Sequence, residues 1–383
     1  MTKISIFVFS YYLEDTRVRK QCELLSEKGH IVDVYCLRRV GETKFEFKNG
    51  VRINRVGFER RLTGRSKFRY IVEYLRFFVI CLFINISRLR SAKLIIFHNM
   101  PNFLIFSATF SRLINVPIIL DVHDLMPELI LSKDFESGRF LYRLLLLEER
   151  YSHRFATTRI TVNKPISKFL QERTGVNYDV IHNGPLISRI NPKRKNIRAS
   201  SLVFLGNIHE RYGLDKIIVN FAALIQRIED ITLDIYGDGP HLEAIKDKIR
   251  NGGLEDRIFC HGKYEPDDVE KILSNHAIGI ALLDKNLQND LSIPVKTTEY
   301  IMNSTPFLCT DLHTVRHYFP EGGMVYVDDG DTEQIQAAIY DLVTNHQKYV
   351  KSLRHSQKII SDINWEIDSE KFISIIDRNL EQS

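Results

Sequence analysis

Short apolar segments with the pattern of β-strands alternate with segments of helical periodicity along most of this chain, and this alternation is the feature that most restricts its fold. Residues 4–9 have the pattern of a buried strand, residues 15–28 that of a helix ending before Gly29, and residues 31–37 that of the next strand. These three segments predict a βαβ unit. Further strands are predicted at residues 94–97, 117–121, 159–162 and 179–181. We therefore expect a mostly parallel sheet with helices on both faces.

A second series of strands is predicted in the other half of the chain. It begins at residues 201–206 and continues at residues 232–236, 258–261, 277–283, 307–310 and 324–327. Between the two series, residues 182–185 (HNGP) and the polar, basic residues 191–200 predict a hinge. The 383 residues are enough for two domains of ordinary size. The expected α/β fold consists of two doubly wound domains, which bind ligands at the ends of their strands.

The composition limits the compartment and the partner. A net charge of +5 suggests an anionic partner such as a nucleotide, a phospholipid or a nucleic acid, although it also fits a simple effect on solubility. The five cysteines are scattered and odd in number, which argues against a disulfide framework and against a cysteine-based zinc site. The strand pattern of residues 4–9 follows the N-terminus directly and lacks the features of a signal peptide. We expect a cytoplasmic protein.

Residues 294–306 (PVKTTEYIMNSTP) predict a helix that begins with anion-binding character. Pro294 presets φ for the first helical turn. The free N–H groups and the positive end of the helix dipole attract anions there, and Lys296 adds a mobile positive charge. Glu299, one turn later, can accept hydrogen bonds from a ribose diol. The stretch predicts a nucleotide-diphosphate site, and the alternative is an ordinary amphipathic helix with a solvated lysine and glutamate.

Several nucleotide-binding and metal-binding motifs are missing from the sequence. The loop after the first predicted strand lacks GxGxxG, which disfavours a dinucleotide-binding domain, and the chain has no GxxxxGK[ST] motif of a P-loop enzyme. It also has no HExxH helix and no clear DxD triplet at a strand end. The pairs Asp121 with Asp124 and Asp328 with Asp329 do not have the spacing of a DxD triplet. We therefore expect no bound metal and no cofactor.

A basic segment precedes a very apolar helix in the first half of the chain. Its cations are Arg60, Arg61, Arg65, Lys67 and Arg69. The uncharged stretch that follows, residues 77–87, is about half the ~20 residues that span a bilayer, so a transmembrane helix is rejected. The helix can bury its apolar face in the core or lie at a membrane interface, and the two arrangements can share the element. We expect the cations to meet the inner-membrane surface.

Motifs in both halves resemble those of glycosyltransferase family 4, whose members have the GT-B fold, and the resemblance covers nearly the whole chain. In the second half, the matching stretches are residues 204–214 (FLGNIHERYGL), 235–240 (IYGDGP), 261–262 (HG) and 294–306. They occur in the order of the family and at about its spacing. In the first half, residues 15–18 (DTRV), 121–128 (DVHDLMPE) and 180–185 (VIHNGP) resemble the subgroup that builds bacterial surface polysaccharides.

The resemblance implies a fold and a reaction. The fold would consist of two Rossmann-like domains that face across a cleft, with residues 1–184 on the acceptor side and residues 185–363 binding the nucleotide-sugar. Residues 364–383 would form a C-terminal helix that packs back on the first domain. The reaction would be a retaining, metal-independent transfer of a sugar from a nucleotide-sugar, expected to be UDP-linked, to a glycan or polyprenyl-diphosphate-linked acceptor. A nucleic-acid partner is not expected.

The resemblance also assigns roles to individual residues. The expected catalytic residues are His123, which orients the donor sugar, and Arg211 and Lys296, whose charges stabilise the departing diphosphate. The expected donor-binding residues are Gly206, Asn207, Gly237, Gly239, His261, Asp290, Leu291, Ser292 and Glu299. The expected acceptor-side residues are Tyr11, Tyr12, Arg17, His98, Asn99 and Asp124.

The sequence departs from the family pattern in two places. Asn207 and Tyr212 stand in a loop where many members carry an arginine and a lysine, which leaves Arg211 as the cation of that loop. Leu291 stands where many members carry the first of two glutamates, and Asp290, Ser292 or backbone N–H groups are the candidates to replace it. Two alternatives to a transferase stay open: a GT-B epimerase that acts on a UDP-sugar, and a nucleotide-sugar-binding protein without turnover.

Overall fold

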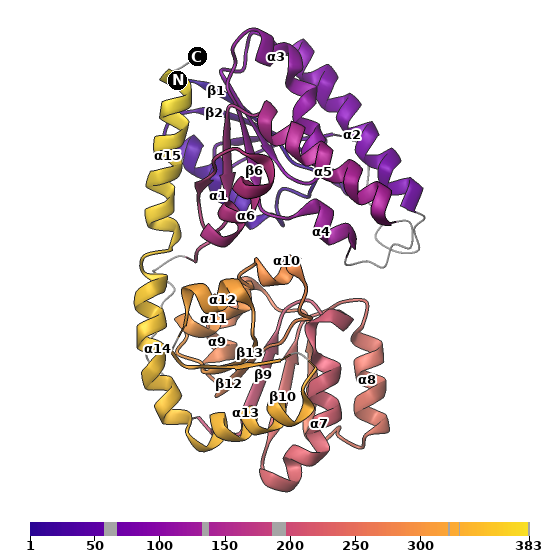
Figure 1. The fold of residues 1–383 in the computed structure, drawn as a ribbon, viewed down its shortest axis with the longest axis vertical. Helices are drawn as coiled ribbons and strands as arrows, with labels where there is room; N and C mark the ends of the chain where they lie inside the picture. The colour runs from indigo at the N-terminus through magenta and orange to yellow at the C-terminus, as the bar shows by residue number, and fades with distance from the viewer. Residues whose placement is uncertain (57–66, 132–137, 186–196, 321, 329, 382–383) are drawn as a thin grey trace. The chain divides into compact units, whose positions relative to one another are not determined.

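The computed structural model describes residues 1–383 apart from residues 57–66, 132–137, 186–196, 321, 329 and 382–383. The chain divides into two compact units (Figure 1). Unit 1 comprises Met1–Asn183 together with Ile367–Ser383, and unit 2 comprises Gly184–Glu366. Each unit contains its own mainly or wholly parallel sheet, which confirms the predicted α/β fold.

The sheet of unit 1 has eight strands in the order β3-β4-β2-β1-β5-β6-β7-β8. Its strands are β1 (Lys3–Phe7), β2 (Ile31–Cys36), β3 (Phe45–Lys48), β4 (Val51–Arg55), β5 (Leu94–His98), β6 (Ile118–Val122), β7 (Thr158–Thr161) and β8 (Asp179–Val180). All neighbouring strands are parallel except β3 and β4. The central strands are buried on both faces, which explains their almost continuous apolar runs.

The antiparallel hairpin of β3 and β4 was absent from the sequence-based prediction. Asn49 and Gly50 connect the two strands, with φ of +50° and +76°. Positive φ at both central residues is the requirement of a type I′ hairpin turn, and Asn-Gly satisfies it best. The signal was therefore present in the sequence, although the exposed Phe45 and Phe47 weaken the apolar pattern of β3.

Helices cover the sheet of unit 1 on both faces (Figure 1). They are α1 (Thr16–Glu27), α2 (Lys67–Ser87), the 3₁₀ helix η1 (Asn102–Ala108), α3 (Thr109–Leu113), α4 (Met126–Leu131), α5 (Gly138–Phe155) and α6 (Lys164–Thr174), with α15 (Trp365–Glu381) at the C-terminus. None of the described helices is long and apolar enough to cross a membrane. The predicted membrane-contacting Arg60, Arg61 and Arg65 lie outside the described residues, and of Lys67 and Arg69 only the helical backbone is described.

Helix α15 returns to the sheet of unit 1, as predicted for the C-terminal helix. The Asn379 side chain accepts a hydrogen bond of 2.9 Å from Thr158 of β7, and Arg378 pairs with Asp179 of β8 at 2.5 Å. At the start of this return, the carboxylate of Asp368 accepts from the backbone N–H of His182 at 2.8 Å and contacts its ring at 2.9 Å. These contacts attach the C-terminal segment to the last two strands of the sheet.

Unit 2 has six parallel strands in the order β11-β10-β9-β12-β13-β14. Its strands are β9 (Ser201–Leu205), β10 (Thr232–Tyr236), β11 (Ile258–Gly262), β12 (Ile278–Ala281), β13 (Phe307–Thr310) and β14 (Met324–Val327). Its helices are η3 (Glu210–Tyr212), α7 (Leu214–Arg227), α8 (Leu242–Asn251), η4 (Pro266–Asp268), α9 (Val269–Leu273), α10 (Leu287–Asp290), α11 (Val295–Met302), α12 (His313–Tyr318), α13 (Thr332–Thr344) and α14 (His346–Ile360). One apolar core lies on each face of the sheet.

Candidate functional site

Helix α11 is held against the sheet of unit 2 by Tyr300. The side chain of Tyr300 is fully buried, and its hydroxyl donates to the backbone oxygens of Val203 at 3.3 Å and Ile280 at 3.2 Å. The ring lies over Gly279 of β12, where a Cβ would come within 2.7 Å of three ring atoms. A larger residue at position 279 would push the helix away from the sheet. This contact sets the position of Lys296, one turn before Tyr300.

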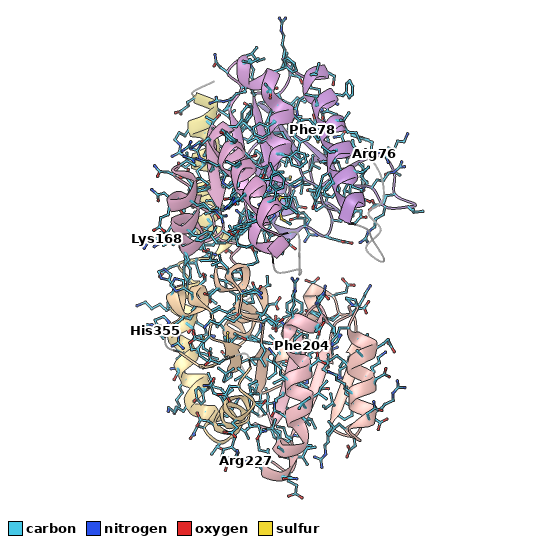
Figure 2. The ribbon with its side chains drawn as sticks, turned by 45° about the vertical axis from the view of Figure 1, so that its right-hand side comes forward. Arg76, Phe78, Lys168, Phe204, Arg227 and His355 are labelled. Carbon is cyan, nitrogen blue, oxygen red and sulfur yellow. The ribbon has the colours of Figure 1, made fainter. Side chains whose placement is uncertain are left out.

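The ammonium group of Lys296 is buried and has no hydrogen-bond partner among the described residues. Its Nζ lies 3.8 Å from the ring centre of Phe204, which is labelled in Figure 2, and 5.0 Å from that of Tyr212. Burial lowers the pKa of Lys296 to about 7, against the opposing charges of Glu299 and Cys309. Aromatic faces stabilise a cation but accept few hydrogen bonds, so the three N–H donors of Lys296 suit an anionic ligand.

Arg211 lies beside the same aromatic ring. Its guanidinium carbon is 5.2 Å from the ring centre of Tyr212, its Nη2 donates to the Tyr212 hydroxyl at 3.4 Å, and its buried Nε has no hydrogen-bond partner among the described residues. The backbone oxygen of Arg211 accepts from Asp284 N at 3.0 Å, which fixes η3 to the end of β12. The structure thus brings both predicted cations, Arg211 and Lys296, to Tyr212. We did not predict this tyrosine, because nothing in its sequence position signals the contact.

Three predicted glycines occupy the loops that follow β9 and β10. Gly206 has φ of +122°, and a Cβ there would meet only the end of Lys296, at 3.8 Å and 3.9 Å. At Gly237 a Cβ would lie 1.8 Å from the backbone oxygen of Gly206, and at Gly239 it would lie 2.1 Å from that of Ile208. Gly237 and Gly239 therefore allow the two loops to pack against each other, whereas Gly206 places its Cα next to the Lys296 ammonium.

Three further residues predicted to bind the donor, Glu299, His261 and Asn207, also lie in unit 2. Glu299 is close enough to oppose the fall in the pKa of Lys296 and, together with burial, to raise the pKa of Tyr264 to about 12. The ring of His261 stacks on Tyr236 with ring centres 4.3 Å apart, and its Nε2 lies 2.6 Å from Asp234. Asn207 is exposed. A role of these residues in binding the donor stays a prediction.

Asp234 lies between two histidines, His261 and His276, and we did not predict this cluster from the sequence. Besides His261, the carboxylate of Asp234 faces Nε2 of His276 at 3.2 Å. Burial raises the pKa of Asp234, but the hydrogen bonds from His276 and His261 outweigh it and hold the pKa below its usual range. The three residues are separated along the chain: the pairing of β10 with β11 brings Asp234 and His261 together, and His276 comes from the segment just before β12.

The loop that carries the predicted substitutes for the missing glutamate is engaged in local structure. Asp290 accepts a hydrogen bond from the backbone N–H of His313 at 2.8 Å, at the start of α12. The side chain of Leu291 is buried, and Ser292 Oγ donates to the backbone oxygen of Asn289 at 3.0 Å. The carboxylate of Asp290 therefore stabilises a helix start, and its predicted contact with the donor sugar would have to compete with that bond.

In unit 1, Arg17 and Asp121 form a buried ion pair. The Arg17 guanidinium donates to both oxygens of Asp121, at 2.9 Å and 2.8 Å, and to the backbone oxygen of Ile181 at 2.9 Å. Gln21 adds a third donor to Asp121 at 2.7 Å. Burial alone would raise the pKa of Asp121, but Arg17 holds it well below the usual range. Arg17 thus joins α1 to the ends of β6 and β8.

Two histidines lie close to this ion pair. His98 is fully buried with its Nδ1 3.5 Å from Asp121, and burial lowers its pKa to about 4, so the ring is neutral at pH 7. The ring centre of His123 is 6.2 Å from that of His98. Asn99 orients the His123 loop, because it accepts from His123 N at 3.0 Å and donates to Asp124 O at 2.6 Å. The structure therefore brings His123, Asn99 and Asp124 together at the ends of β5 and β6.

His98, Asp121 and His123 also form the group of metal-ligand type that the described residues contain, with ligand atoms within 4.8 Å of one another. A divalent cation needs free carboxylate lone pairs and a negative environment. Both oxygens of Asp121 already accept from Arg17, whose fixed charge would repel the metal. Asp121 therefore fits a structural ion pair with Arg17 better than it fits a metal ligand.

Several predicted acceptor-side residues lie beneath the surface of unit 1. The exposed fractions of Arg17, Tyr12 and His98 are 5%, 2% and 0%. These three side chains are too deeply buried to contact an acceptor directly. They are directed into the core and support the strand ends. Tyr11 is half-buried, with the Arg39 guanidinium 4.5 Å from its ring centre. Sequence reasoning could place these residues near a strand end but could not determine their depth.

Comparisons with known proteins match both units. The family described as glycosyl transferase 4-like domain matches residues 15–184, and the family described as glycosyl transferases group 1 matches residues 199–345. No curated protein matches the chain by sequence. Among solved structures, sucrose-phosphate synthase from Thermosynechococcus elongatus has a TM-score of 0.80 at 14% identity, with all of both chains covered.

Two further structures are similar over nearly their whole length. HepE of Anabaena, in complex with UDP and glucose, has a TM-score of 0.69 at 12% identity, covering 98% of this chain and 100% of its own. The lipopolysaccharide outer core galactosyltransferase WaaB has a TM-score of 0.62 at 12% identity, covering 94% and 99%. At these identities the structural likeness establishes the fold, and the two family matches establish the class. The chain is a glycosyltransferase of the GT-B fold.

Proposed function

We propose that the protein is a retaining, metal-independent glycosyltransferase of family 4 that uses a UDP-sugar. The observation that supports this most is the Lys296 ammonium, which is buried at the start of α11 without a hydrogen-bond partner among the described residues. A diphosphate would supply the missing acceptors. Arg211 contacts the same tyrosine, Tyr212, as Lys296 does. It would add a second positive charge beside the diphosphate.

In the proposed reaction, the bond between the anomeric carbon of the sugar and the diphosphate oxygen breaks, and the oxygen keeps the electron pair. Lys296, Arg211 and the N–H groups at the start of α11 would stabilise the developing negative charge. The leaving phosphate would accept the proton of the acceptor hydroxyl, which attacks the same face of the sugar. His123 would orient the sugar. Retention and the role of His123 rest on the resemblance to family 4.

The donor and acceptor are proposed from the surroundings of the site and from related proteins. Glu299 would bind the ribose hydroxyls of UDP, the nucleotide present in the HepE structure. A lipopolysaccharide transferase among the similar structures supports a glycan or polyprenyl-diphosphate-linked acceptor in surface polysaccharide synthesis. Such an acceptor would place the protein in the cytoplasm at the inner face of the membrane, where the cations of residues 60–69 would contact lipid.

Donor binding is tested by thermal shift with UDP, ADP, GDP and uridine, because a ligand that binds only the folded state raises the unfolding midpoint. We expect UDP to raise it more than uridine, since uridine lacks the diphosphate. The matched variant Lys296→Ala should lose the difference between UDP and uridine. Equal shifts for both ligands in the unmodified protein would overturn the diphosphate site.

Transfer is tested with radiolabelled UDP-sugars and membrane extract as the source of acceptor. Incorporation of label into glycan or lipid supports the transferase. Because Leu291 replaces a family glutamate and Asp290 is engaged with His313, a protein that binds UDP without turnover is the second candidate. UDP binding without incorporation from any donor would favour it, and conversion of the free UDP-sugar to its epimer would indicate an epimerase.

A further inference from the structure

Helix α2 of unit 1 is apolar on two sides. Its inner side buries Phe77 and Cys81 completely. Its outer side exposes Ile71, Val72, Leu75, Val79, Phe83 and Ile86. Successive members of this outer set are one, three or four residues apart, so they form one stripe along the helix. A globular helix with one buried face normally presents polar residues to water, whereas most of the exposed residues described on α2 are apolar.

Helix α5 of unit 1 carries a second exposed apolar stripe. Phe140, Leu144, Leu147 and Tyr151 expose 81%, 51%, 51% and 62% of their surface. Their spacing of four, three and four residues places them on one side of the helix. The opposite side buries Leu145 and packs on the core. Large aromatic and aliphatic side chains at this exposure are unfavourable in water unless something covers them.

Helices α2 and α5 both pack against η1, which is followed directly by α3. Phe103 of η1 contacts Phe78 of α2 with ring centres 5.9 Å apart, and Phe106 of η1 contacts Phe155 of α5 at 5.2 Å. Helix α3 continues η1 and exposes Phe110 and Leu113, and Ile114 directly after the helix is also exposed. Figure 1 shows α2, α3 and α5 grouped on one side of the unit 1 sheet. We call the exposed apolar residues of these three helices the α2–α5 face.

The charges on these helices are distributed asymmetrically. Their exposed charged residues are the arginines Arg76, Arg90, Arg112, Arg143, Arg150 and Arg154, counting the turn after α2. On α5, Arg143, Arg150 and Arg154 are seven and four residues apart and form a row beside the apolar stripe. Figure 2 shows Arg76 on the outer side of α2, away from the labelled Phe78.

The carboxylates of the same helices are all turned inward. Glu73 of α2 is buried. Glu148 of α5 accepts hydrogen bonds from Ser152 and Asn102, and burial raises its pKa to about 7. Glu149 pairs with Arg173 at 2.6 Å. Among the described residues of α2, α3 and α5, the exposed surface therefore combines apolar side chains with positive charge and presents no exposed carboxylate.

We propose that the α2–α5 face docks the protein on an anionic phospholipid bilayer, with the apolar stripes in the interface and the arginines at the headgroups. Amphipathic helices that lie in a membrane surface have this combination of aromatic and leucine side chains flanked by arginine. A second copy that meets this face with its own would place arginine against arginine without a compensating carboxylate, whereas anionic headgroups neutralise the row. The docking surface consists of described helices and does not depend on the transfer chemistry, so its test and that of the proposed function can fail separately.

The test is co-sedimentation of the full chain with vesicles of phosphatidylcholine alone and of phosphatidylcholine and phosphatidylglycerol in equal parts. We expect binding to the anionic vesicles, weakened by salt. Each arginine contributes about fivefold to partitioning, so Arg143→Gln with Arg150→Gln should lower it on the order of 25-fold. Lys351→Gln with Arg354→Gln, which removes two exposed cations of unit 2, is the matched control and should bind as the unmodified chain does.

Insertion of the apolar stripe has its own readout. Phe140→Trp should show a blue-shifted emission when anionic vesicles are added, whereas Val219→Trp in unit 2 should not. Light scattering after size-exclusion chromatography follows the oligomeric state in the absence of lipid. Equal binding to both vesicle types, an unshifted Phe140→Trp emission, or a dimer that Phe140→Ser with Leu147→Ser dissolves would each overturn the proposal.

Discussion

Replacing Lys296 by methionine should stabilise unit 2 and abolish its preference for a diphosphate. Methionine keeps most of the apolar length of the side chain beside Phe204 and Tyr212 but removes the buried ammonium. That ammonium has no hydrogen-bond partner among the described residues, and a buried cation without an acceptor destabilises the folded state. The substitution therefore tests two effects of Lys296 separately: its contribution to diphosphate binding and its cost in folding stability.

The magnitude follows from the pKa. Burial lowers the pKa of Lys296 from 10.5 to about 7, and a tenfold change in proton affinity corresponds to about 1.4 kcal/mol. At pH 7 the lysine then lowers the free energy of unfolding by at most about 4 kcal/mol. Because the folded-state pKa lies below the unfolded one, this penalty is fully present below the folded pKa. It disappears as the pH rises from about 7 to 10.5.

The assay is thermal unfolding of Lys296→Met and the unmodified chain across that pH window. Even a quarter of the penalty, about 1 kcal/mol, raises the midpoint by about 2–4 °C for a unit of this size. The gain should be largest at pH 7 and shrink toward pH 10. Lys351→Met, which replaces an exposed lysine of α14, is the control and should show no such gain.

Calorimetry supplies an independent check on the unmodified chain. If a diphosphate pairs with Lys296, it raises the pKa of the ammonium, so UDP binding at pH 8 should take up most of one proton and binding at pH 6 almost none. Buffers of different ionisation enthalpy report that uptake. A variant Lys296→Met that is less stable than the unmodified chain at pH 7, together with UDP binding that takes up no proton, would refute the reasoning.

Three further predictions concern the donor, the metal and the support of unit 1. Glu299→Gln should weaken UDP affinity in calorimetry, and an unchanged affinity would refute the assignment of this residue to the ribose. Transfer should persist in excess chelator, and NMR should show an α-linked product from an α-linked donor; collapse in chelator with recovery on added metal, or a β-linked product, would count against the mechanism. Asp121→Asn should destabilise unit 1 by about 3 kcal/mol in denaturant unfolding, because Arg17 then lacks its buried counter-charge. Because the pKa of Asp121 is lowered in the folded state, the stabilisation by this ion pair should disappear as the pH falls through about 4 and below. A free energy of unfolding that does not change with pH in this range would contradict the prediction.

The sequence predicted most of the fold because each buried strand is a short apolar run between polar turns. The strands at Leu94–His98 and Phe307–Thr310 are buried along their whole length, and such runs are visible without any tertiary information. The hairpin of β3 and β4 was missed, because its outer strand is half-exposed and lacks that run. Its signal was instead the Asn49-Gly50 turn.

The candidate site was predictable only in part. The motif around Pro294 indicated Lys296 and Glu299, since both lie within one helical turn of a recognisable helix start. The contacts of Lys296 with Phe204 and Tyr212 join residues more than eighty positions apart, and no local pattern indicates them. Depth was equally out of reach, because the sequence places Arg17 beside a strand end but does not show that it is buried.

Each unit contains a buried cation: the one in unit 1 has hydrogen-bond acceptors, and the one in unit 2 has none among the described residues. This difference distinguishes a residue that stabilises the fold from one that is suited to bind a ligand. Arg17 is surrounded by acceptors on Asp121 and Ile181, so Nε, Nη1 and Nη2 all donate within the fold and the residue needs no ligand. Lys296 faces two aromatic rings and Gly206, so its donors find no acceptor among the described residues, and burial lowers its pKa. Burial alone would describe both residues in the same way. The number of acceptors each one meets separates them, because a folded chain keeps an unsatisfied buried charge only where something other than the fold requires it.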